Sequence, residues 1–117
     1  MKAVSVNVNS LAWSKTAEYP AGTEQKVLSE GGTIAPRVIM LKLPPGWEMG
    51  SHSHRFTELH YVLDGEIESQ GKTYAAGTFR VIPESVEHGP FSSKAGATVL
   101  VIWCSITETE DGSDAGD

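Results

Sequence analysis

The chain has 117 residues, 39% of them hydrophobic, and a mean hydropathy of −0.20. This length gives room for one domain with one core, and no apolar run reaches the roughly 20 residues that cross a bilayer. Five of the fifteen acids lie in the last ten residues, so residues 1–107 carry nine bases against ten acids. A nearly neutral body without a basic cluster is not expected to bind nucleic acid.

Cysteine usage and the two ends of the chain bear on its location. The single cysteine, Cys104, excludes an internal disulfide and fits a reducing compartment. It lies in an apolar run, where a free thiol is expected to pack as a small hydrophobe. Residues 1–10 lack the basic and apolar segments of a secretory signal, so we expect a cytoplasmic protein without a membrane segment. The acidic residues 108–117 are expected to be disordered.

The first segment, residues 1–23, has no clear periodicity. Trp13, Tyr19 and Pro20 give it apolar anchors. We therefore expect an arm that packs on the rest of the domain, residues 24–107, or on a partner subunit. A homodimer is expected, because the edge strands of a small sandwich need cover that this arm could supply.

The remaining elements are predicted to be short strands separated by Gly, Pro and Asn signals. Gly31-Gly32 is predicted to form a tight turn, Asp64-Gly65 is predicted to end a strand, and the chain is predicted to turn again at Gly71. Strands recurring at this spacing indicate an all-β sandwich or barrel. The expected strands are residues 24–28, 37–43, 58–63, 66–70, 78–82 and 98–106.

The most informative pattern lies in the middle of the chain. Gly46, five residues, His52-x-His54, three residues, Glu58, six residues and Gly65 follow one another. Side chains two apart on a strand point to the same face, so the two imidazoles are aimed at one point. A carboxylate and a third imidazole would complete a mixed nitrogen and oxygen set for a divalent transition metal.

A second run opens at Gly77 and carries Pro83 and His88. The first pattern resembles the first cupin motif and the second run resembles the second cupin motif, although Ser85 and Ser92 replace the usual Gly and Asn. The resemblance covers residues 37–106 and implies a single jelly-roll β-barrel.

By this resemblance the metal ligands are His52, His54, Glu58 and His88. They would hold one divalent transition metal ion per chain, for which Fe, Mn, Ni, Zn and Cu are all candidates. Glu58 either ligates the metal or lies outside the ligand set and orients a ligand or a bound water.

His60 shares a strand face with Glu58 if residues 58–63 form one regular strand. It then points into the ligand cavity, where His60 and Glu58 are candidates for catalytic roles. The alternative is a buried histidine bonded to a backbone carbonyl. Arg37, Arg55 and Arg80 are candidates for holding an anionic substrate group.

The function expected first is that of a mononuclear metal-dependent enzyme, a dioxygenase-type oxidoreductase acting on a small polar or dicarbonyl substrate. The segments around both motifs are similar to cupins of diketone-cleaving dioxygenases and to cupin modules of bacterial anti-sigma factors. Two alternatives stay open. One is a metal-dependent isomerase or lyase, and the other is a non-catalytic module that senses a metal or ligand.

Overall fold

Strands make up almost all of the regular structure. The computed structural model describes residues 2–52 and 55–104. Apart from a short 3-10 helix, η1 (Val8–Ser10), its elements are β1 (Ser14–Lys15), β2 (Glu24–Glu30), β3 (Arg37–Leu43), β4 (Trp47–Met49), β5 (Glu58–Ser69), β6 (Lys72–Ala75), β7 (Phe79–Ile82), β8 (Phe91–Ser93) and β9 (Ala97–Trp103).

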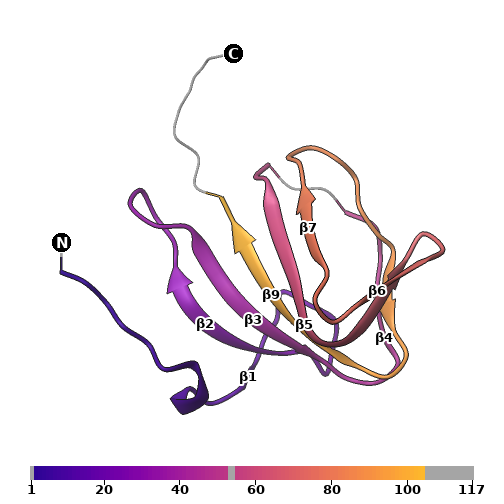
Figure 1. Ribbon diagram of the computed structural model, residues 1–117, viewed down its shortest axis with the longest axis horizontal. Helices are drawn as coiled ribbons and strands as arrows, with labels where there is room; N and C mark the ends of the chain where they lie inside the picture. Colours follow the sequence, from indigo (N-terminus) through magenta and orange to yellow (C-terminus); the bar gives the residue numbers. More distant parts are fainter. Residues whose placement is uncertain (1, 53–54, 105–117) are drawn as a thin grey trace.

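The strands form one curled sheet. The hydrogen-bonded order is β1-β2-β3-β9-β5-β8-β4, and β6 and β7 also pair with β5. Every pairing is antiparallel. The sheet curls so that β4 and β6 face the layer of β2, β3 and β9 (Figure 1). The predicted all-β jelly-roll barrel is thereby confirmed.

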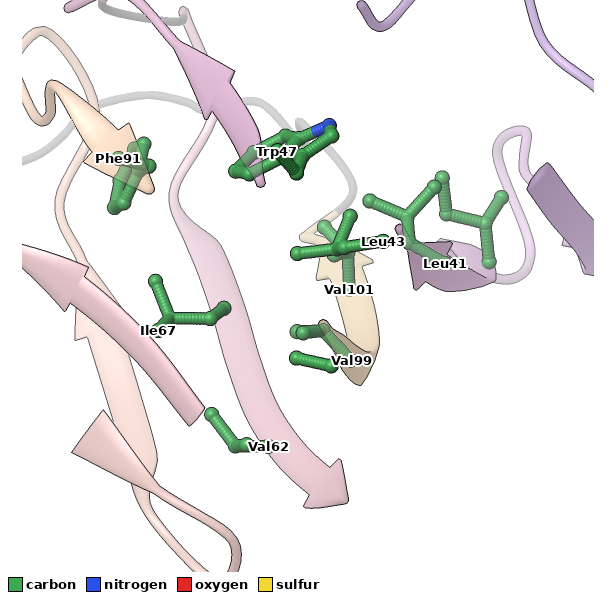
Figure 2. Packing of buried hydrophobic residues seen from close by; sticks show 10 residues of the cluster. Leu41, Leu43, Trp47, Val62, Ile67, Phe91, Val99 and Val101 are labelled. Atoms are coloured by element: carbon green, nitrogen blue, oxygen red, sulfur yellow. The ribbon is translucent and has the colours of Figure 1, made fainter. Parts of the chain in front are cut away.

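The core lies on the inner surface of this curl. Ile39, Leu41 and Leu43 alternate with more exposed residues along β3, as a strand with one buried face requires. Val99 lies opposite Leu41, and Val101 lies opposite Ile39 on β9. Figure 2 shows the inner side chains of β3, β4, β5, β8 and β9 packed toward one another.

The expected strand end at Asp64-Gly65 is wrong. β5 runs unbroken through this dipeptide for 12 residues. The register shifts between Val62 and Asp64, and Gly65 has φ +73°. A bulge beside a positive-φ glycine bends a strand without reversing it. β5 therefore pairs with β7 and β9 along its first part and with β6 and β8 along its second.

Besides the two-residue β1, three short strands were not expected from the sequence. β4 and β8 pair with each other, and β6 pairs with the end of β5. They have only 3 or 4 residues each, too few to show a period. Their pairing partners, which lie far away in sequence for β4 and β8, decide their conformation.

The N-terminal residues lie against the chain's own barrel. Lys26 of β2 is buried, and its Nζ donates a hydrogen bond to the carbonyl of Val8 at 2.9 Å. Nζ of Lys26 lies over the ring of Trp13, 4.7 Å from its centroid, and Nζ of Lys42 lies 5.6 Å from the same centroid. The boundaries given above for the arm and the acidic tail stay predictions, and the tail lies outside the described residues.

The described part of the chain contains no helix long and apolar enough to cross a membrane.

Gly65 and Gly71 make a matched pair for testing the bend in β5. Both have positive φ, but a Cβ on Gly65 would collide with the carbonyl of Gly96, whereas a Cβ on Gly71 meets nothing. Gly71→Ala should therefore cost only the backbone strain, about 1–2 kcal/mol. Gly65→Ala should add overpacking and cost about 2–5 kcal/mol. Urea unfolding of both variants measures the difference, and equal losses would contradict this account of the bend.

Candidate metal centre

Two histidines meet where the two motif loops pair. The backbone N–H of His52 donates to the carbonyl of His88 at 2.9 Å, and the N–H of His88 donates to the carbonyl of His52 at 2.8 Å. These residues form an isolated antiparallel bridge outside the named strands. The bridge sets the ring centroids 4.3 Å apart.

Both rings present the same nitrogen to the site. Nδ1 of His52 is 3.2 Å from the carbonyl of Gly50, and Nδ1 of His88 is 3.0 Å from the carbonyl of Val86. A carbonyl only accepts, so each hydrogen bond places the proton on Nδ1 and leaves the lone pair on Nε2. A backbone carbonyl holding one ring nitrogen is the arrangement that orients histidines in metal sites.

The carboxylate comes from the first residue of β5. Glu58 is only 2% exposed. Nε2 of His60 lies 2.8 Å from Oε1 of Glu58, and since a carboxylate only accepts, His60 is the donor. As expected from the strand period, Glu58 and His60 share a face. The acceptor is a carboxylate, however, and not the backbone carbonyl considered above.

The donor atoms of His52, Glu58 and His88 all lie within 4.8 Å of one another. Two imidazoles and a carboxylate at this separation could hold a divalent transition metal ion. The fourth residue expected here, His54, lies outside the described residues, so its place in the ligand set stays a prediction.

Burial lowers the pKa of His88 below its ordinary value, and the charges of His52 and His60 act in the same direction. The hydrogen bond to Val86 and the charge of Glu58 oppose the shift. His88 is therefore neutral at neutral pH, the form in which an imidazole binds a metal.

A cavity of about 40 Å³ adjoins two of the three donors, His52 and Glu58. A single water needs roughly 10–15 Å³ measured in this way, so the cavity has room for a ligand of only a few heavy atoms. Four polar side chains line the cavity, those of His52, Glu58, His60 and Tyr19. The other lining side chains are apolar, except for the indole N–H of Trp47. The remaining lining residues are Leu41, Leu43, Trp47, Met49, Ile67, Phe91, Val99 and Val101.

A groove of about 300 Å³ lies on the other side of Tyr19 and Met49, which line both spaces. Arg37, Glu18 and Trp103 complete the groove. The guanidinium of Arg37 lies 3.6 Å from Glu18 and stacks over Trp103 at 5.6 Å. Arg37 thus borders the approach to the cavity, but with its charge already paired.

The other two candidate arginines lie elsewhere. Arg80 stacks over the ring of Tyr74 at 4.2 Å, and Arg55 is exposed. Neither lines the cavity. Tyr19 does, although sequence reasoning treated it only as an apolar anchor, because no motif marks a tyrosine in an irregular arm as a pocket residue.

The jelly roll and its paired histidine loops define a cupin. Residues 1–106 match the family described as the ChrR Cupin-like domain, and the chain belongs to this family. Over 73 residues it is 30% identical to the anti-sigma-E factor ChrR of Cereibacter sphaeroides, a match that covers 62% of this chain and 33% of that protein. The chain thus spans about a third of that relative's length.

Two solved structures show the same fold. ChrR in complex with SigE, from Rhodobacter sphaeroides, has a TM-score of 0.65 at 22% identity, covering 84% of this chain and 52% of that one. An acetylacetone dioxygenase from Acinetobacter johnsonii has a TM-score of 0.69 at 14% identity, covering 88% of this chain and 73% of that one.

The geometry predicts which variants lose a bound metal. The purified chain should take up one divalent transition metal ion, and His88→Ala or His52→Ala should lower affinity strongly because each removes a donor. His60→Gln, which changes only the neighbour of Glu58, should keep the ion. Elemental analysis after dialysis gives the stoichiometry. Full retention in His88→Ala would show that the metal lies elsewhere.

Proposed function

We propose that this chain is a mononuclear metal-dependent enzyme, a dioxygenase-type oxidoreductase that acts on a small polar or dicarbonyl substrate. The observation that carries the proposal is the cavity lined by His52 and Glu58, two of the three donors, which leaves this side of the donor set facing space for a ligand. A purely structural metal is usually enclosed by its ligands, whereas a catalytic one keeps a position open.

His52, Glu58 and His88, with His54, would hold the metal. When bound, it would supply Lewis-acid activation of a substrate carbonyl and a position for O₂. A dioxygenase transfers both atoms of O₂ to its products, so no external reductant is required. The apolar walls would exclude bulk water and favour the uncharged parts of a substrate.

His60 and Glu58 would act as a unit. The hydrogen bond from Nε2 of His60 holds one carboxylate oxygen of Glu58, so the carboxylate keeps a defined orientation toward the donor set. His60 also lines the cavity. It would thus hold a proton at Nε2, beside the place where a substrate binds.

The size of the cavity limits the substrate. A space of about 40 Å³ accepts the reacting group of a dicarbonyl compound but not a large substituent. A longer substrate would pass between Tyr19 and Met49 into the groove at Arg37, which favours neutral substrates because Glu18 already pairs with this guanidinium.

A second candidate function is a module that senses a metal or ligand without catalysis. The match to an anti-sigma factor favours it. Its output would pass through contacts with another polypeptide. An isomerase or lyase would use the same residues as the dioxygenase.

We also propose that the chain forms a homodimer and lies in the cytoplasm. The dimer is supported by the outer apolar face, defined here as Leu59, Tyr61, Phe79 and Val81 on β5 and β7. Val81 pairs with Leu59 and Phe79 with Tyr61 across the two strands. Phe79 and Val81 are 57% and 58% exposed, and a contiguous apolar face of this kind is typical of protein interfaces.

Oxygen consumption tests the enzyme proposal. The chain reconstituted separately with Fe(II), Mn(II), Ni(II), Cu(II) and Zn(II) should consume O₂ with acetylacetone or a related β-dicarbonyl in at least one redox-active form. His60→Gln should lower turnover about 10- to 100-fold with the metal retained, because the amide can still donate to Glu58 but cannot take up and release a proton as an imidazole does. Tight zinc binding with no O₂ uptake by any metal form would favour the sensing module instead.

Light scattering tests the dimer. The intact chain should have the mass of two copies, and Val81→Lys should weaken association by about tenfold or more, because it buries a charge at the interface. Val4→Lys is the matched control, since Val4 is 75% exposed but lies outside the outer apolar face. A monomeric wild-type chain would refute the dimer.

A further inference from the structure

Tyr19 is held in the wall of the metal cavity by the turn that follows it. Thr23 N donates to the carbonyl of Pro20 at 3.2 Å, and Gly22, with φ +91°, occupies the third position of this turn. The hydroxyl of Thr23 also donates to Pro20 at 2.6 Å and accepts the indole N–H of Trp47 at 2.8 Å. The turn is thereby tied to β4, inside the barrel.

Three other polar N–H groups around the cavity already have hydrogen-bond partners. The indole N–H of Trp47 is used by Thr23, Nε2 of His60 by Glu58, and Nδ1 of His52 by Gly50. The Tyr19 hydroxyl, by contrast, has no hydrogen-bond partner among residues 2–52 and 55–104. Tyr19 lines both the cavity and the groove, and a partly buried tyrosine hydroxyl is expected to find a partner in one of these spaces.

The surroundings of Tyr19 keep its hydroxyl protonated. Burial raises the pKa of Tyr19 well above its ordinary value, and the negative charge of Glu58 raises it further. The charge of Glu18 acts in the same direction, and that of Arg37 opposes the shift in pKa. The hydroxyl is therefore a donor throughout the physiological pH range.

We propose that Tyr19 is a specificity-determining residue, whose hydroxyl donates a hydrogen bond to an oxygen atom of a small ligand held in the metal cavity. This inference rests on the proposed metal site. The ligand class is a small carbonyl or carboxylate compound with a second oxygen acceptor beyond the atom that binds the metal. A ligand without such an acceptor leaves the hydroxyl without a partner and is disfavoured for that reason.

Tyr19→Phe removes the donor and keeps the ring, so the turn and the apolar packing stay in place. The full chain is loaded with Co(II), whose visible spectrum reports changes in coordination, and is titrated with acetate or with ethanethiolate. Both probes have only a few heavy atoms, but only acetate offers a second oxygen. Tyr61→Phe is the matched control, because Tyr61 lies on the outer face of β5 and is 39% exposed.

Tyr19→Phe should weaken acetate binding by about tenfold, the loss expected for one hydrogen bond to a charged acceptor. It should leave ethanethiolate binding and Co(II) stoichiometry unchanged, and Tyr61→Phe should change nothing. Equal acetate affinity in Tyr19→Phe and wild type, or equal weakening of the binding of both probes, would overturn the proposed role of Tyr19 but not the proposed metal site. Failure of the wild-type chain to bind Co(II) would overturn the metal site and this inference with it.

Discussion

The two reciprocal hydrogen bonds between the backbones of His52 and His88, 2.9 and 2.8 Å long, join loops from distant parts of the sequence. They set the two imidazoles side by side, while the carbonyls of Gly50 and Val86 hold both Nδ1 atoms and so leave Nε2 of each ring for the site. The relative position of the two histidines is therefore set by hydrogen bonds between backbone atoms, and not by contacts between side chains.

The burial of Glu58 gives a physical reason for the histidines around it. A carboxylate that is 2% exposed loses its hydration and needs compensation within the protein. The hydrogen bond from His60 supplies part of this, and a divalent cation among the donors would supply much more. The neutral state of His88 fits the same arrangement, since burial disfavours its protonated form. The polar cluster could thus hold a divalent cation.

The N-terminal arm forms part of the cavity wall, in addition to the strands of the barrel. Its turn at Pro20 and Thr23 is tied to Trp47, and it places Tyr19 between the inner cavity and the groove that holds Arg37. The motif residues prepare a donor set common to many reactions. The arm, whose sequence follows no motif, shapes the space in which a ligand would sit, and loops and arms on a common scaffold are where specificity usually arises.

The sequence by itself determined the fold class and singled out His52, Glu58 and His88, which the structure brings together. The apolar runs at residues 37–43 and 98–106 and the spacing of the two motifs can be recognised from the local sequence alone, and the strand period also put His60 beside Glu58. Only the tertiary structure decided three other features. Gly65 lies at a bend of β5 and does not end the strand. A positive φ is compatible with either a turn or a bulge, and the pairing of β5 with β9 on both sides of this position makes it a bulge. β4 and β8 exist because they pair with each other. Tyr19 becomes a cavity residue because a turn far from both motifs is anchored to Trp47, and an anchor between residues distant in the chain leaves no local pattern in the sequence.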